Sequence, residues 1–224
     1  SLMKAYTLSS RVITFLIQYS LSDPNMYTWP ETDIGGLLEF YLETPTSDRC
    51  VLQTIPEFVA DLVKGRPGGK RTPHDSAAQF NEYSEGILAA LRGIVPGDDE
   101  KELRSSLVDF KVLAYLARYH ALKTEAGIRV EGYFQTGDGS LLREAQDLLR
   151  QGTMVWEAII SLTEDVYYDR MVTGPSDAGC WKAKRSLVYE DELRLAELCA
   201  LHERYGLTDE MLDLFNSCLL YTSD

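Results

Sequence analysis

The sequence predicts an all-α protein, an irregular multi-helix bundle built around a long antiparallel helix hairpin. Apolar residues recur at three- and four-residue steps on both sides of a short polar link at residues 135–140. This spacing places apolar side chains on one side of a helix, and a short link folds two helices back as antiparallel neighbours. No stretch alternates apolar and polar residues for long enough to predict a sheet. The apolar positions are Leu103, Leu107, Phe110, Ala114 and Ala117 before the link, and Leu141, Ala145, Leu148, Leu149, Val155, Trp156, Ile159 and Ile160 after it.

The elements before the hairpin are predicted from apolar spacing and stop signals. A first helix is expected from about Lys4 to Tyr19, and it should end before Pro24 because proline cannot continue a helix. A short helical run through Leu38 and Tyr41 should stop at Pro45.

Two capping motifs predict the next two helix starts. Residues 54–57, Thr-Ile-Pro-Glu, have the spacing of a capping box, with proline in the first turn, where its missing N–H costs little. That helix should run to Lys64, with Gly65 as its stop. Residues 72–75, Thr-Pro-His-Asp, should cap a following helix that stops at Gly93.

Acidic residues at 98–100 should open the first hairpin helix, because negative charge stabilises a helix N-terminus. A last long helix is expected over Leu187 to Tyr205, and a short one should start at Thr208. The total is seven to nine helices in one domain over residues 1–216. Residues 217–224 resemble the adapter read-through found at the ends of metagenomic gene predictions, so we expect a non-native tail on a fragment of a longer, bacterial protein.

Composition narrows the possible partners. The 224 residues are 45% hydrophobic and 25% charged, which is typical of a globular domain. A net charge of −13 disfavours nucleic acid and anionic membrane surfaces, so a neutral or cationic partner fits better. No apolar run approaches the roughly 20 residues that span a bilayer. The four cysteines form no Cys-x-x-Cys pair. Buried free thiols are expected, with two disulfides as the alternative.

No motif for catalysis, a metal or a cofactor is found, and none of these is expected. The Glu-x-x-His motif of di-iron bundles is absent, and His120 is expected to be a partly buried histidine with its hydrogen bonds satisfied. There is no Gly-x-Ser-x-Gly motif. Residues 65–71 lack the spacing of a phosphate-binding loop, which favours a solvated basic turn.

Two aromatic loops are the candidate contact sites. Flat rings cover the apolar face of a sugar, and carboxylates accept hydrogen bonds from its hydroxyls. Loops also carry function more often than helix faces do. The alternative is that these rings only cap the core. The candidates are Tyr27, Trp29, Glu31 and Asp33 in the first loop, and Tyr167, Asp169 and Trp181, next to Tyr168, in the second.

Four segments resemble the helical C-terminal region of large bacterial glycoside-hydrolase-like, carbohydrate-active multidomain proteins. These segments are residues 27–38, 113–123, 136–138 and 181–182. Such proteins place the catalytic barrel upstream, so the resemblance implies an accessory helical module that is not catalytic by itself. Its partner would be a missing upstream domain or a glycan. Cys180 departs from the polar residue or histidine expected before Trp181.

Two other classes of function remain open. The chain could be a self-contained helical protein-interaction domain that uses the same aromatic loops as its contact surface. An all-helical enzyme is the third alternative, and it would require a cleft lined by convergent polar groups.

Overall fold

A computed structural model describes residues 1–20, 38, 41–42, 46, 48–66, 68–172, 178–206 and 208. Within these residues the protein is a helical bundle, which confirms the predicted all-α class. A 3₁₀ helix, η1 (Trp181–Lys184), and two two-residue strands, β1 (Met171–Val172) and β2 (Ala178–Gly179), complete the described elements. The α-helices are α1 (Leu2–Ser20), α4 (Ile55–Val63), α5 (Pro73–Leu91), α6 (Lys101–Thr136), α7 (Gly139–Thr163) and α8 (Arg185–Tyr205).

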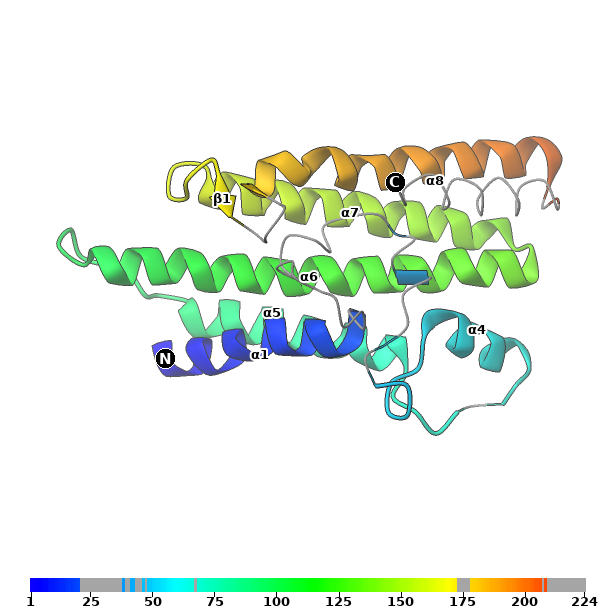
Figure 1. Cartoon of the computed structure of the whole chain (residues 1–224), viewed down its shortest axis with the longest axis horizontal. Coiled ribbons are helices and arrows are strands. Elements are labelled where there is room, and N and C mark those ends of the chain that lie inside the picture. The colour runs from blue at the N-terminus through cyan, green and yellow to red at the C-terminus, as the bar shows by residue number, and fades with distance from the viewer. Residues whose placement is uncertain are drawn as a thin grey trace.

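The long helix α6 is the centre of the bundle. It packs most extensively against α7 and α5, and it also contacts α1 and α4. Helix α1 lies on α5, and α8 lies on α7, so five long helices stack side by side (Figure 1). The predicted hairpin is confirmed as α6 and α7. The link between them turns at Gly137, whose positive φ of 73° favours glycine.

Local capping chemistry explains where α4 and α5 begin. The Thr54 hydroxyl accepts the backbone N–H of Glu57 at 3.3 Å, and the Glu57 carboxylate accepts the backbone N–H of Thr54 at 3.1 Å. Thr72 and Asp75 make the same reciprocal pair, with both distances 3.0 Å. Both predicted caps are therefore confirmed. Glu100 precedes α6 without a side-chain cap bond of this kind.

Some predicted details differ from the structure. The last helix begins at Arg185, two residues before the predicted Leu187, because the chain already turns as η1. The antiparallel pair Met171–Gly179 and Val172–Ala178 was not predicted, since two residues per strand leave no alternating pattern. The short helix expected from Thr208 lies outside the described residues. Cys50, Cys180 and Cys199 are free thiols, but Cys50 is exposed and the other two are only partly buried, so their predicted burial was wrong.

Two apolar clusters fill the bundle. The larger joins α1, α4, α5, α6 and α7 and includes Phe80 and Trp156, both fully buried. The smaller joins the end of α6 to α7 and α8 around Tyr133. Most predicted inward positions on the hairpin are buried, whereas Leu103, Phe110, Leu141, Leu148 and Val155 are half-buried at the margins. Among the described helices, none is both long enough and apolar enough to cross a bilayer.

Candidate functional site

A small pocket opens where α7 ends and η1 leads into α8, at the end of the bundle that carries β1 (Figure 1). Its volume is about 260 Å³. It contains all three candidate residues of the second aromatic loop. The four candidates of the first loop, Tyr27, Trp29, Glu31 and Asp33, lie outside the described residues. The pocket is lined by Ile160, Thr163, Glu164, Tyr167, Tyr168, Asp169, Cys180, Trp181 and Lys182.

Trp181 forms the buried wall of the pocket and is fixed by the core. Its ring meets the Trp156 ring edge-on, with centroids 5.4 Å apart. The Trp156 indole N–H donates to the Trp181 carbonyl oxygen at 3.1 Å. The indole nitrogen of Trp181 itself is buried and has no acceptor among the residues that the structure describes. Trp181 therefore does cap the core, and it also presents a preformed wall to the pocket.

The two adjacent tyrosines play different parts. The Tyr167 hydroxyl donates to the Asp109 carboxylate of α6 at 2.5 Å, which ties the end of α7 to the central helix. Burial, together with the Asp109 hydrogen bond and charge, raises the pKa of Tyr167, so its phenol stays neutral. Tyr168, by contrast, is 86% exposed. One ring is thus anchored and the other is available to a partner.

Charged groups surround the rim. Lys182 Nζ lies 3.2 Å from Glu164 Oε1, and both side chains are more than half exposed. Asp169 is exposed and makes no ion pair with another described residue. Two carboxylates and one ammonium group therefore line the pocket, and the ammonium group is already paired with Glu164.

A second polar cluster lies sealed inside the bundle, and the sequence did not predict it. Lys123 Nζ on α6 lies 2.5 Å from Asp191 Oδ2 on α8, and the side chains are only 1% and 3% exposed. Lys123 also donates to the Tyr119 hydroxyl at 3.1 Å, and the other Asp191 oxygen accepts the backbone N–H of Leu38 at 2.7 Å. Burial lowers the pKa of Lys123, but the Asp191 carboxylate and the Tyr119 hydroxyl together outweigh burial and raise it, so the Lys123 ammonium stays protonated.

His120 belongs to the same cluster. Its Nδ1 is hydrogen-bonded to the Tyr41 hydroxyl, whereas its buried Nε2 has no partner among the described residues. The expectation of a partly buried histidine was therefore wrong, because His120 is fully buried, and the expected hydrogen bonding is found at Nδ1 but not at Nε2. Burial, and then the nearby Lys123 charge, lowers the pKa of His120 well below its ordinary value. Since the side chains are sealed, this cluster joins α6 to α8 and to the Leu38–Tyr41 segment and is not placed to meet a substrate.

The neutral state of His120 predicts a pH effect. An imidazole with a depressed pKa contributes stability that is present above its unfolded value of about 6.5 and is lost as the pH falls. We expect the unfolding free energy to fall between about pH 6.5 and 5 by at most about 1.4 kcal/mol per pH unit from this group. Urea unfolding of the wild type and of His120→Gln at several pH values in this interval measures the change in unfolding free energy. The same slope in both proteins would contradict the assignment.

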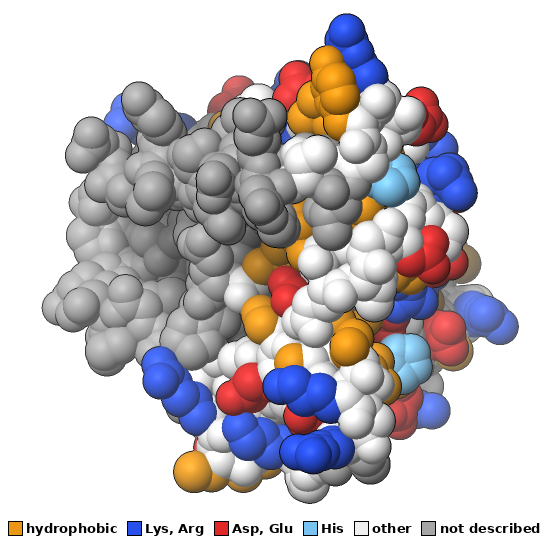
Figure 2. All heavy atoms as spheres, turned by 90° about the vertical axis from the view of Figure 1, so that its right-hand side faces the viewer, with side chains coloured by type: hydrophobic (Ala, Val, Ile, Leu, Met, Phe, Trp, Pro, Cys, Tyr) orange, Lys and Arg blue, Asp and Glu red, His pale blue; other side chains and the backbone are white. Residues whose placement is uncertain are grey.

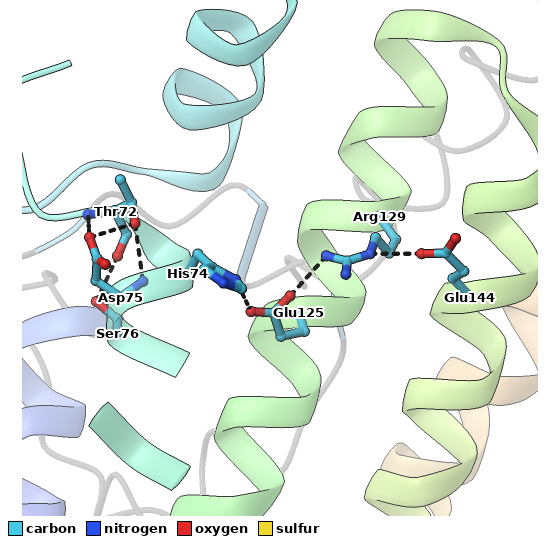
Figure 3. A network of polar contacts seen from close by, with 7 residues as sticks. All are labelled: Thr72, His74, Asp75, Ser76, Glu125, Arg129 and Glu144. Atoms are coloured by element: carbon cyan, nitrogen blue, oxygen red, sulfur yellow. Dashed lines mark hydrogen bonds and ion pairs between the residues drawn. The ribbon is translucent and has the colours of Figure 1, made fainter. Parts of the chain in front are cut away.

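A chain of polar contacts links α5, α6 and α7 near the surface (Figure 3). His74 Nδ1 is hydrogen-bonded to Glu125 at 2.5 Å, and Arg129 makes ion pairs with Glu125 at 2.8 Å and with Glu144 at 3.0 Å. Partly exposed ion pairs such as the two of Arg129 each contribute about 1 kcal/mol or less. In the part of the chain that the structure describes, no group of histidine, cysteine and carboxylate side chains is arranged to hold a metal ion.

The basic segment between α4 and α5 lies at the opposite end of the bundle from the pocket. Figure 2 shows this end of the bundle, with Lys and Arg side chains gathered on its lower part, at the level of α4. Lys64 and Arg66 are exposed, Lys70 pairs with Glu57 at 3.2 Å, and the Arg71 guanidinium lies over the Phe15 ring. The backbone of Arg71 pairs with the 51–53 segment. Arg66 is therefore exposed, as predicted for a solvated basic turn, whereas Lys70 and Arg71 are only partly exposed.

No protein-family model and no curated protein matches this sequence. Among solved structures, the fold is similar to that of a GH138 enzyme targeting pectin rhamnogalacturonan II, with a TM-score of 0.76 and 16% sequence identity. The similarity covers 89% of this chain and 32% of the enzyme's chain, so this chain spans about a third of that protein. It establishes that the two chains share a fold over this region.

Proposed function

We propose that this chain is a non-catalytic helical accessory module of a larger bacterial carbohydrate-processing protein, and that the pocket lined by Tyr168, Asp169 and Trp181 is its glycan contact. One observation carries the proposal: nearly the whole chain shares its fold with only a third of a carbohydrate-active enzyme. A helical unit of this kind can therefore be one part of such an enzyme. The aromatic rings and carboxylates of the pocket supply the chemistry that sugars favour.

The carboxylates of the described pocket support a non-catalytic role. A glycosidase uses two carboxyl groups that flank one bond, and one of them is kept protonated by its surroundings. Glu164 is more than half exposed and paired with Lys182, and Asp169 is exposed. Asp191 in the bundle centre is sealed and ion-paired, so it cannot protonate a leaving group.

The full chain tests this proposal in two measurements. We expect it to be retained on polysaccharide affinity gels and to release no sugar or aryl alcohol from aryl glycosides. Recovery of the flanking gene sequence should show a catalytic carbohydrate-active domain. Hydrolysis that is lost in Glu164→Gln would instead make the chain an enzyme. Absence of both glycan retention and a carbohydrate-active neighbour would overturn the proposal.

An interaction domain is the second candidate, because apolar side chains are exposed on α7 and α8. Met154 is 69% and Leu193 66% exposed, and Tyr189 lies four residues before Leu193, hence on the same face of α8. Glycan retention by the wild type separates the two functions, and Leu193→Asp is the control for the exposed apolar face of α8. Under the accessory-module proposal both proteins are retained, whereas an interaction domain would show no glycan retention in either protein.

A further inference from the structure

We infer that the pocket at the end of α7 binds a single uncharged sugar residue and discriminates against sugar acids. This inference rests on the proposed function and specifies the ligand class of the same site. Three observations carry it: the size of the pocket, the arrangement of its rings, and the sign of the charges at its rim.

The size limits the ligand to about one ring. Pockets for drug-sized ligands are usually about 300–1,000 Å³, and this pocket has about 260 Å³. An oligosaccharide would place one residue inside the pocket and leave the rest over the surface around Tyr168.

The aromatic side chains of the pocket are already positioned to contact the flat apolar face of a sugar. Trp181 is held against Trp156 and Tyr167 is held by Asp109, so neither has to be ordered on binding. Tyr168 is the exposed ring, and it can cover the outer face of a sugar whose other side meets the Trp181 wall.

The charged side chains at the rim of the pocket should favour neutral sugars over acidic ones. Asp169 can accept hydrogen bonds from sugar hydroxyls, which are donors in every neutral hexose. A uronate carboxylate would approach Asp169 and Glu164, while the Lys182 ammonium is already shared with Glu164. Repulsion from one like charge at about 4 Å in water amounts to about a fivefold loss of affinity. The protein's net charge of −13 adds to this preference.

The experiment compares matched sugars on the full chain. Titrations followed by ¹H–¹⁵N chemical shifts would use the methyl glycosides of glucose and galactose, each beside its uronate. We expect the neutral sugar to bind at least about fivefold tighter than its uronate. Tyr168→Ala should weaken neutral-sugar binding about tenfold. Tyr205→Ala is the matched control, because Tyr205 is also exposed but ends α8 at the far end of the bundle (Figure 1).

A second variant isolates the charge. Asp169→Asn keeps hydrogen-bonding capacity and should narrow the difference between neutral sugar and uronate. Uronates that bind as tightly as neutral sugars, or tighter, would overturn this inference and leave the accessory-module proposal intact. If none of the four sugars shifts a pocket resonance, the inference fails together with the glycan contact. The gene context and polysaccharide retention then decide the accessory role separately.

Discussion

We expect the Lys123→Met variant to lose about 3–5 kcal/mol of unfolding free energy, the largest effect of any polar substitution proposed for this protein. Lys123 Nζ lies 2.5 Å from Asp191 Oδ2 in a region where both side chains are sealed from water. Methionine fills much of the same volume but removes the cation, and the Asp191 carboxylate then stays buried without it. Urea unfolding at pH 7 measures the loss.

Two control variants separate the effect of the buried charges on stability from the effect of side-chain packing. The double variant Lys123→Met, Asp191→Leu removes both charges and should recover much of the lost stability, since apolar replacement of a whole buried pair is often neutral. Arg150→Met breaks the exposed Arg150–Asp147 pair, 3.1 Å apart, and should cost no more than about 1 kcal/mol. A loss below about 1 kcal/mol for Lys123→Met would show that water reaches the pair.

The parts of the fold that the sequence predicts well depend on neighbouring residues in the chain. Apolar spacing identified the α6–α7 hairpin, because both helices bury a continuous set of side chains. The starts of α4 and α5 were predicted because each capping box lies within four residues, 54–57 and 72–75. The start of α8 was misplaced because η1 has no comparable signal.

The buried ion pair could not be predicted, because the central helix does not follow the usual amphipathic pattern. Most residues of α6 between Leu116 and Tyr133 are buried, since α5, α7, α4 and α1 contact this helix from several directions. Lys123 would face solvent on a helix with one exposed side. Its partner Asp191 belongs to another helix, and only the packing of α8 beside α7 brings the two together.

The pocket was only partly predictable. Ring-rich loop sequences pointed to Tyr167, Asp169 and Trp181, and the structure brings these three residues to one pocket. Glu164 and Lys182 were missed because single charged residues at helix ends resemble ordinary surface residues. The pairing of the Tyr167 hydroxyl with Asp109 also depends on how α7 ends beside α6, which residue spacing does not specify.

Trp156→Ala should also cost about 3–5 kcal/mol, and it should disturb the pocket more than its stability loss alone implies. Trp156 is fully buried on α7, its ring contacts Tyr119 and Trp181, and its indole N–H donates to the Trp181 carbonyl oxygen at 3.1 Å. Removing the ring takes away the support of the pocket wall. We therefore expect unfolding at lower urea and a change in the near-ultraviolet circular dichroism of the remaining tryptophans.

Two further variants test whether Trp156 connects the core to the pocket. Trp156→Phe keeps a ring but loses the N–H, so it should recover part of the stability and leave the Trp181 carbonyl without this donor. Met154→Ala changes a largely exposed side chain on the same helix and should cost under about 0.5 kcal/mol. Suppose that Trp156→Ala, under conditions where it is folded, leaves both the near-ultraviolet circular dichroism of Trp181 and the affinity for neutral sugars unchanged. Trp156 is then not needed to position the Trp181 wall of the pocket. Recovery of the pocket by Trp156→Phe, together with its loss in Trp156→Ala, would instead show that ring packing, more than the hydrogen bond, positions Trp181.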